Sequence, residues 1–196
     1  MNRFLSRVRL TVLAPLLLLA ACASAPVPTD LYYSLTPVFE TESSPLKTRL
    51  VVEPFQFGGV YAERPLLFRR GVALAQYHHQ FWAESPALMW RNALIDSLRV
   101  GGAANAVTPE TRVTSDYVIR ARMKRMEQIL DQESRALLAL EFAVTDAAGR
   151  NVLVIEFEEQ LPLGSDEPEE YAKAINQLAG RAFAQLNAGL REKLPR

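Results

Sequence analysis

Three neighbouring segments in the second half of the chain alternate apolar and polar side chains, and this alternation constrains the fold most. They run from Asp116 to Leu130, from Ser134 to Asp146 and from Asn151 to Gln160. Successive side chains of a β-strand point to opposite faces of a sheet, so a period of two indicates strands with one buried and one wet face. The connections are short, and the second contains Gly149. The pattern predicts an antiparallel sheet.

Two amphipathic helices are expected to cover this sheet. Apolar residues recur at helical spacing from Pro86 to Arg99, and again from Pro168 to the end of the chain. Ser85 is expected to cap the first helix with its hydroxyl, and Asp166 or Glu167 to cap the second. Each proline then stands in the first turn, where its missing N–H costs nothing.

Shorter apolar segments in the first half predict further strands. Leu31–Leu35 predicts the first strand, and Arg49–Phe55 predicts a buried central strand. Leu66–Arg70 and Val72–Tyr77 predict a hairpin that turns at Gly71, where glycine allows a positive φ. The expected fold class is α/β: a mixed, largely antiparallel sheet packed with two main helices in a single domain.

The N-terminal residues have the three zones of a bacterial export signal. Arg3, Arg7 and Arg9 precede an apolar run from Leu10 to Ala21 that is short for a membrane span and contains Pro15. The run ends in Leu-Ala-Ala-Cys, which resembles a lipobox. We expect residues 1–21 to be a lipoprotein signal peptide, although an ordinary secretory signal with a chance cysteine is the alternative.

Cys22 is then the lipidated first residue of the mature protein, and it is the only cysteine. Residues 22–30 are small, polar and interrupted by prolines, so they are expected to form an extended tether of roughly 25 Å. Residues 31–196 form the expected periplasmic domain. Ala23, where an aspartate favours inner-membrane retention, indicates an anchor in the outer membrane.

Charge and composition exclude several function classes. The chain has 22 Lys and Arg against 22 Asp and Glu, and loss of the signal peptide would leave it weakly acidic. Nucleic-acid binding through a broad basic field is therefore not expected. His78 and His79 point to opposite faces of a strand, so no metal site is expected. Ser85 lacks the glycine-flanked elbow of a nucleophilic serine. We expect neither a cofactor nor catalysis.

Three basic side chains share one face of a predicted strand. Arg120, Arg122 and Lys124 lie at alternate positions, so they would contact lipid phosphates or an acidic partner, or else form an ordinary solvent face. Glu141 on the next strand could pair with them. The solvent-face interpretation is favoured.

Aromatic residues are dense between Phe68 and Trp90. Phe81 and Trp82 lie just before the first helix, where they either fill the core or anchor an interface. The sequence favours neither alternative.

Several motifs together resemble the ABC-type transport auxiliary lipoproteins, the family that includes PqiC. The likeness extends from about Leu31 to Leu190. Its motifs are Tyr32-Tyr33-Ser34-Leu35, Val51-Val52-Glu53-Pro54, Arg64-Pro65, Arg69-Arg70 and Phe81-Trp82-Ala83-Glu84-Ser85-Pro86. The residues before Phe81-Trp82 are His79-Gln80, whereas an arginine-rich or His-Arg sequence is usual at this place in the family.

The resemblance implies a non-enzymatic subunit that works with an MCE-domain protein and its ABC transporter in moving phospholipid between membranes. Phe81, Trp82, Arg69 and Arg70 are then the candidates for contact with the partner. A homo-oligomer is possible by analogy with the ring of an MCE tunnel. The alternative function is a stand-alone envelope assembly or structural lipoprotein, such as an accessory to secretion or lipopolysaccharide assembly.

Overall fold

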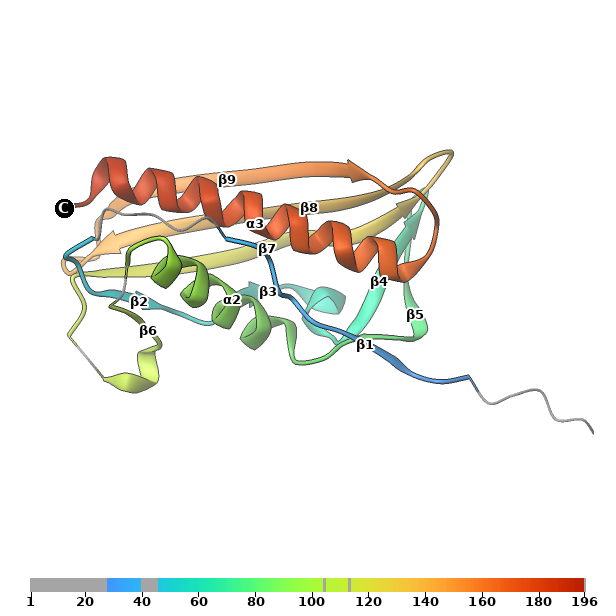
Figure 1. Ribbon diagram of the computed structural model, residues 1–196, viewed down its shortest axis with the longest axis horizontal. Helices are drawn as coiled ribbons and strands as arrows, with labels where there is room; N and C mark the ends of the chain where they lie inside the picture. Colours follow the sequence, from blue (N-terminus) through green and yellow to red (C-terminus); the bar gives the residue numbers. More distant parts are fainter. Residues whose placement is uncertain (1–27, 40–45, 104, 113, 196) are drawn as a thin grey trace, which may run out of the picture.

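A computed structural model describes residues 28–39, 46–103, 105–112 and 114–195. One mixed sheet and two long helices make up most of this part of the chain (Figure 1). The strands are β1 (Leu31–Tyr33), β2 (Leu50–Val52), β3 (Gln56–Phe57), β4 (Pro65–Arg70), β5 (Ala73–Trp82), β6 (Ala106–Val107), β7 (Tyr117–Leu130), β8 (Ser134–Asp146) and β9 (Asn151–Pro162). The helices are α2 (Pro86–Val100) and α3 (Pro168–Lys193), with short 3-10 turns η2 (Gly59–Ala62) and η3 (Pro109–Thr111).

The three long strands confirm the antiparallel sheet that the alternation predicts. β7 pairs with β8, and β8 pairs with β9, both antiparallel along nearly their whole length. A register shift between Met123 and Arg125 makes Lys124 an extra residue in β7. The side chains of Arg125 and Glu127 consequently continue along one face of the sheet beyond this bulge.

β7, rather than the segment Arg49–Phe55, is the central strand. The short strands β2, β3 and β4 all pair in parallel along the edge of β7 that β8 leaves free. Of the predicted central strand, only Leu50–Val52 forms a strand, β2. This strand lies between β7 and the two-residue β6. The prediction was wrong because a short, fully buried run does not show its place in a sheet.

The predicted hairpin is confirmed as β4 and β5, with Gly71 at φ 56° in the turn. β5 is longer than expected, because it continues through Tyr77 to Trp82 and pairs in parallel with β1 there. Residues 78–82 are therefore sheet, and neighbouring side chains in this segment point to opposite faces.

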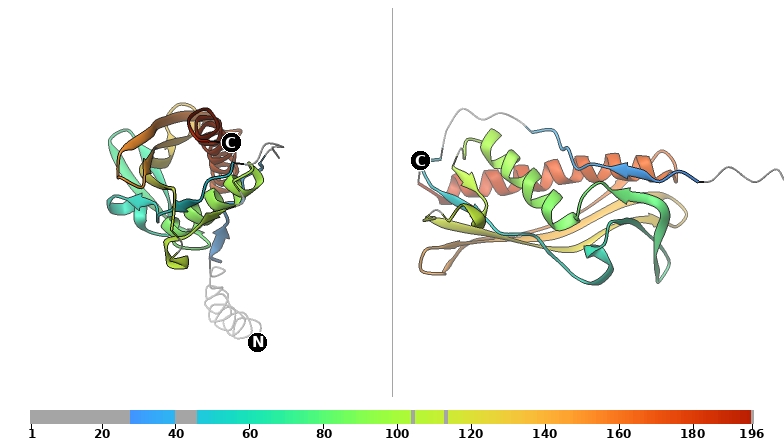
Figure 2. Two further views of the ribbon diagram at one scale, coloured as in Figure 1. Left: turned by 90° about the vertical axis from the view of Figure 1, so that its left-hand side faces the viewer. Right: turned by 90° about the horizontal axis from the view of Figure 1, so that it is seen from below.

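Both long helices pack against the same concave face of the curved sheet (Figure 2). The core between them contains large aromatic side chains, including Trp90 from α2, Phe142 from β8 and Phe183 from α3. α2 begins at Pro86 as predicted, but the Ser85 hydroxyl makes no capping hydrogen bond. Glu167 is the N-cap residue of α3, also without a side-chain bond. None of the helices in the described segments is long and apolar enough to cross a membrane.

Candidate functional site

Exposed Tyr32 and Arg64 lie beside the partly buried Phe81, and these three side chains are called here the aromatic patch. Tyr32 of β1 and Phe81 of β5 are paired in register, and their rings stack with centroids 5.7 Å apart. The guanidinium carbon of Arg64 lies 5.4 Å from the centre of the Tyr32 ring, within range of a cation–π contact. Tyr32 is 56% exposed. The sequence candidate Phe81 is partly buried beneath this ring and contributes the rest of its surface to the patch.

Arg64 is held in place by the backbone. Its Nε donates to the carbonyl oxygen of Trp82 at 3.1 Å, and its Nη2 donates to that of Ala83 at 3.0 Å. The main chain of Trp82 in turn donates to the carbonyl of Arg64 at 2.7 Å. The arginine of the Arg64-Pro65 motif therefore links the start of β4 to the end of β5 and fixes the aromatic patch.

The Trp82 side chain does not belong to this surface, and the expectation that it contacts a partner was wrong. It is 1% exposed and lies 6.3 Å from the ring of Tyr171 in α3. Because β5 extends through this position, Phe81 and Trp82 must point to opposite faces. Trp82 is a core residue.

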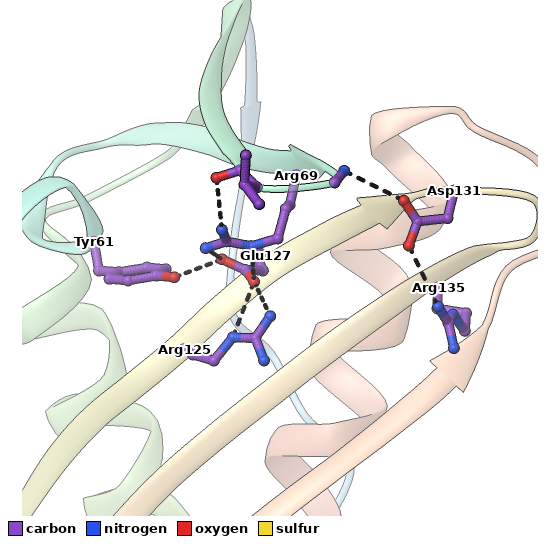
Figure 3. A network of polar contacts seen from close by, with 8 residues as sticks. Tyr61, Arg69, Arg125, Glu127, Asp131 and Arg135 are labelled. Carbon is purple, nitrogen blue, oxygen red and sulfur yellow. Dashed lines mark hydrogen bonds and ion pairs between the residues drawn. The ribbon is translucent and has the colours of Figure 1, made fainter.

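Arg69, another partner candidate, is occupied by a buried carboxylate. Tyr61, Arg69, Arg125 and Glu127 form what we call the Glu127 cluster, on the face of the sheet away from the helices (Figure 3). Glu127 has no exposed side-chain surface. It accepts hydrogen bonds from Arg69 Nε at 2.7 Å and Arg69 Nη2 at 3.0 Å.

Tyr61 and Arg125 complete the shell around this carboxylate. The Tyr61 hydroxyl donates to Glu127 Oε2, and Arg125 donates to Oε1 through both Nε and Nη2. Burial raises the pKa of Glu127, but the hydrogen bonds from Arg69, Tyr61 and Arg125 outweigh it and leave that pKa below its ordinary value. The hydrogen bond to Glu127 also raises the pKa of Arg69. The cluster ties β4 and η2 to β7 and leaves Arg69 unsuited to a partner.

Arg70 is exposed at the end of β4, with its guanidinium 5.7 Å from the ring centre of Phe68. It borders the hairpin turn, whereas Phe81 lies near the other end of the hairpin. At about 3.3 Å per residue, these two candidates are separated by more than 20 Å along β5. The structure therefore does not bring the four predicted contact residues together on one surface.

The basic stripe lies on one face as predicted, but two of its three members are paired with carboxylates. Arg120 forms two hydrogen bonds to Glu53, at 2.8 and 2.9 Å. Lys124 Nζ lies 3.3 Å from Glu141 and 3.2 Å from Glu156, which confirms the pairing expected for Glu141.

Arg122, the third member of the stripe, is exposed. Contacts with Glu156 and Glu141 raise the pKa of Lys124, so this ammonium group stays charged. With carboxylates interleaved along the face, the stripe forms no continuous basic surface for phosphate groups.

His79 Nδ1 lies 2.8 Å from Asp30, which leads into β1. Across the described ranges, no group of three or more His, Cys, Asp or Glu side chains has the geometry to hold a metal ion. Cys22 and Ala23, on which the expected lipid anchor depends, lie outside the described residues.

A groove of about 810 Å³ runs along α3 beside residues 36–39. Two asparagines in its wall bind protein groups: Asn176 accepts from the Thr36 backbone, and Asn187 donates to Ser97. Asn176 therefore connects residues 36–39 to α3, and Asn187 connects α2 to α3.

Sequence reasoning missed Glu127, Arg125 and Tyr61 as a unit. One signal was present, since Glu127 is a carboxylate among the apolar residues Met126, Ile129 and Leu130 near the end of the strand. A charge at such a position is buried only when it is paired. The partner in β4 comes from a parallel pairing that no local pattern specifies.

Comparison with known proteins gives one family match. The family model described as ABC-type transport auxiliary lipoprotein component matches residues 33–187. No curated protein sequence matches the chain. Among solved structures, protein XCC0632 from Xanthomonas campestris is similar with a TM-score of 0.73 and 18% identity, over 80% of this chain and 92% of that one. A crystal structure of an uncharacterized protein has a TM-score of 0.65 and 18% identity, over 84% and 99% of the two chains. These two likenesses show a shared fold.

Proposed function

Because the chain belongs to the family of ABC-type transport auxiliary lipoproteins, we propose that it is a non-enzymatic, lipid-anchored subunit of an ABC/MCE transport system. In this proposal it assists the movement of phospholipid between the inner and outer membranes and so helps to maintain the envelope. The observation that carries the proposal is the family match over residues 33–187, which covers nearly the whole sheet and most of α3.

The proposed anchor is the lipidated Cys22, and Ala23 favours the outer membrane. Two or three acyl chains hold a protein durably on a bilayer, since each buried methylene contributes roughly 0.8 kcal/mol. The tether would then place the domain in the periplasm, where it meets the far end of an MCE protein.

A docking role, rather than catalysis, is supported by what the polar side chains do. Two residues that could serve as a base are engaged in structure: Glu127 lies among two arginines and a tyrosine, and His79 lies beside Asp30. Of the four partner candidates, Arg70 at the exposed turn of the β4–β5 hairpin is the one we retain for contact with the transporter. Val72, 98% exposed, is its apolar neighbour in the same turn.

Crosslinking in cells tests this proposal. A photo-reactive amino acid at Val72 should capture an MCE-domain protein, and the same amino acid at Glu158, on exposed β9, serves as the matched control. Capture of a secretion or lipopolysaccharide-assembly component instead would favour the alternative of an envelope assembly accessory. Absence of any MCE or ABC component from the products of several exposed positions would refute the proposed function.

A further inference from the structure

We propose that the aromatic patch of Tyr32, Phe81 and Arg64 is a membrane contact surface that binds the phospholipid headgroup region next to the anchor. The inference rests on the lipid attachment in the proposed function and assigns the membrane, rather than the transporter, to Phe81. Four observations support it: position, exposure, chemistry and rigidity.

The position of the patch keeps it near the bilayer. β1 lies at the opposite end of the molecule from the C-terminus (Figure 1). Tyr32 is ten positions after Cys22, so the two are at most about 35 Å apart when the chain between them is fully extended. A surface on such a short tether meets the membrane at an effective concentration in roughly the millimolar range, so even a weak affinity produces contact.

The exposure of this strand is unusual for the protein. Within the described ranges, six large hydrophobic side chains are exposed, and two of them, Leu31 and Tyr32, are consecutive. They belong to an edge strand, because β1 pairs only with β5. Natural sheets commonly protect edges with charge, whereas this edge presents apolar and aromatic groups beside the tether.

The chemistry of the patch fits an interface between water and hydrocarbon. Tyrosine has an apolar ring and a polar hydroxyl, and it is enriched at the headgroup level of membrane proteins. Arg64 uses two of its five N–H donors on backbone carbonyls, which leaves donors for a lipid phosphate. Two acidic side chains close in sequence have other contacts: Asp30 with His79 at 2.8 Å, and Glu63 with Gln76 at 2.6 Å.

Rigidity lowers the entropic cost of binding. Arg64 is fixed by its hydrogen bonds to the carbonyls of Trp82 and Ala83, and the Tyr32 ring contacts both that arginine and Phe81. Little side-chain freedom remains to be lost when the patch meets a membrane.

Fluorescence quenching by lipid tests the proposal. The full-length lipidated protein is reconstituted into vesicles of phosphatidylethanolamine and phosphatidylglycerol with brominated acyl chains, as Tyr32→Trp or as the control Val154→Trp. Val154 is 52% exposed and belongs to the first residues of β9 after the β8–β9 turn, and this turn lies at the end of the molecule away from β1 (Figure 1). The native Trp82 and Trp90 are buried, so they contribute an equal background to both variants.

An interfacial side chain lies roughly 5–10 Å into the headgroup boundary, so the added indole of Tyr32→Trp should be quenched at least about twofold more than that of Val154→Trp. Introducing Arg64→Gln into Tyr32→Trp should reduce this quenching while circular dichroism shows that the variant remains folded, at a melting temperature lowered by the loss of the two carbonyl hydrogen bonds. Flotation of both proteins with vesicles but equal quenching would overturn this inference alone. Failure to float would overturn the proposed anchoring and this inference with it. If captured transporter proteins shield position 32 and lipid does not quench it, the patch binds a protein. That result would likewise overturn the inference of a membrane contact.

Discussion

Replacing Glu127 by glutamine should destabilise the protein by about 3 kcal/mol, the lower end of the range for a broken buried ion pair, because Arg69 and Arg125 lose their counter-charge but remain 24% and 38% exposed to water. The carboxylate is fully buried and accepts five hydrogen bonds, from Arg69, Arg125 and Tyr61. Glutamine keeps one acceptor oxygen and adds two N–H donors that face other donors. For a domain of this size, the loss lowers the melting temperature by roughly 10 °C.

The pH dependence of this loss follows from the direction of the pKa shift. The pKa of Glu127 is lower in the folded protein than its ordinary value of 4.5. Its contribution to stability is therefore fully present above the unfolded-state pKa and is lost as the pH falls through the folded-state pKa. The difference in stability between the natural protein and Glu127→Gln should narrow below about pH 4.5.

Denaturant unfolding followed by circular dichroism between pH 3 and pH 7 measures both effects. The control is Glu158→Gln, which removes an exposed carboxylate from β9 and should change stability by less than about 0.5 kcal/mol. Glu127→Gln could instead lose less than about 1 kcal/mol of stability, or lose the same amount at every pH. Either result would show that an ionised Glu127 does not stabilise the contact of β4 and η2 with β7.

Three further changes test other parts of the structure. Trp82→Ala should cost about 3–5 kcal/mol in chemical denaturation, as expected for a buried tryptophan; a stable variant would contradict its place in the core. Gly71→Ala should lower the free energy of unfolding by roughly 1 kcal/mol in the same assay because φ is 56° there. An unchanged denaturation midpoint would contradict the positive φ at this turn. Cys22→Ser should move the protein from the membrane to the soluble fraction on cell fractionation, and continued flotation with membranes would exclude lipidation at this residue.

The long strands were predictable because they combine a clear period with short turns. Ser134–Asp146 was predicted with the bounds that the structure has, and the strands before and after it differ by one or two residues. Helix α2 was predicted to within one residue, since Pro86 and Gly101 delimit it. Alternation, short turns and terminal prolines or glycines therefore predict strands and helices well when the elements that pack together are also consecutive in the sequence.

The parallel pairings were not predictable, because they join segments far apart in the chain. Glu127 and Arg69 are 58 residues apart and meet only because β4 pairs with β7. The same limit explains the error at Trp82, which is in β5 where that strand pairs with β1 and whose ring packs against Tyr171 of α3, far away in the sequence. Once residues 78–82 are known to be a strand, alternation gives Phe81 and Trp82 opposite roles.

Reconstituted transport is the most direct test of the auxiliary role. The ABC transporter captured with the lipoprotein would be placed in donor vesicles, and the lipidated protein in acceptor vesicles, with labelled phospholipid as the reporter. We expect ATP-dependent transfer that rises when the lipoprotein is present and falls to the level of empty acceptor vesicles with Cys22→Ser. Transfer at the same rate with and without the lipoprotein would contradict an auxiliary role in transport.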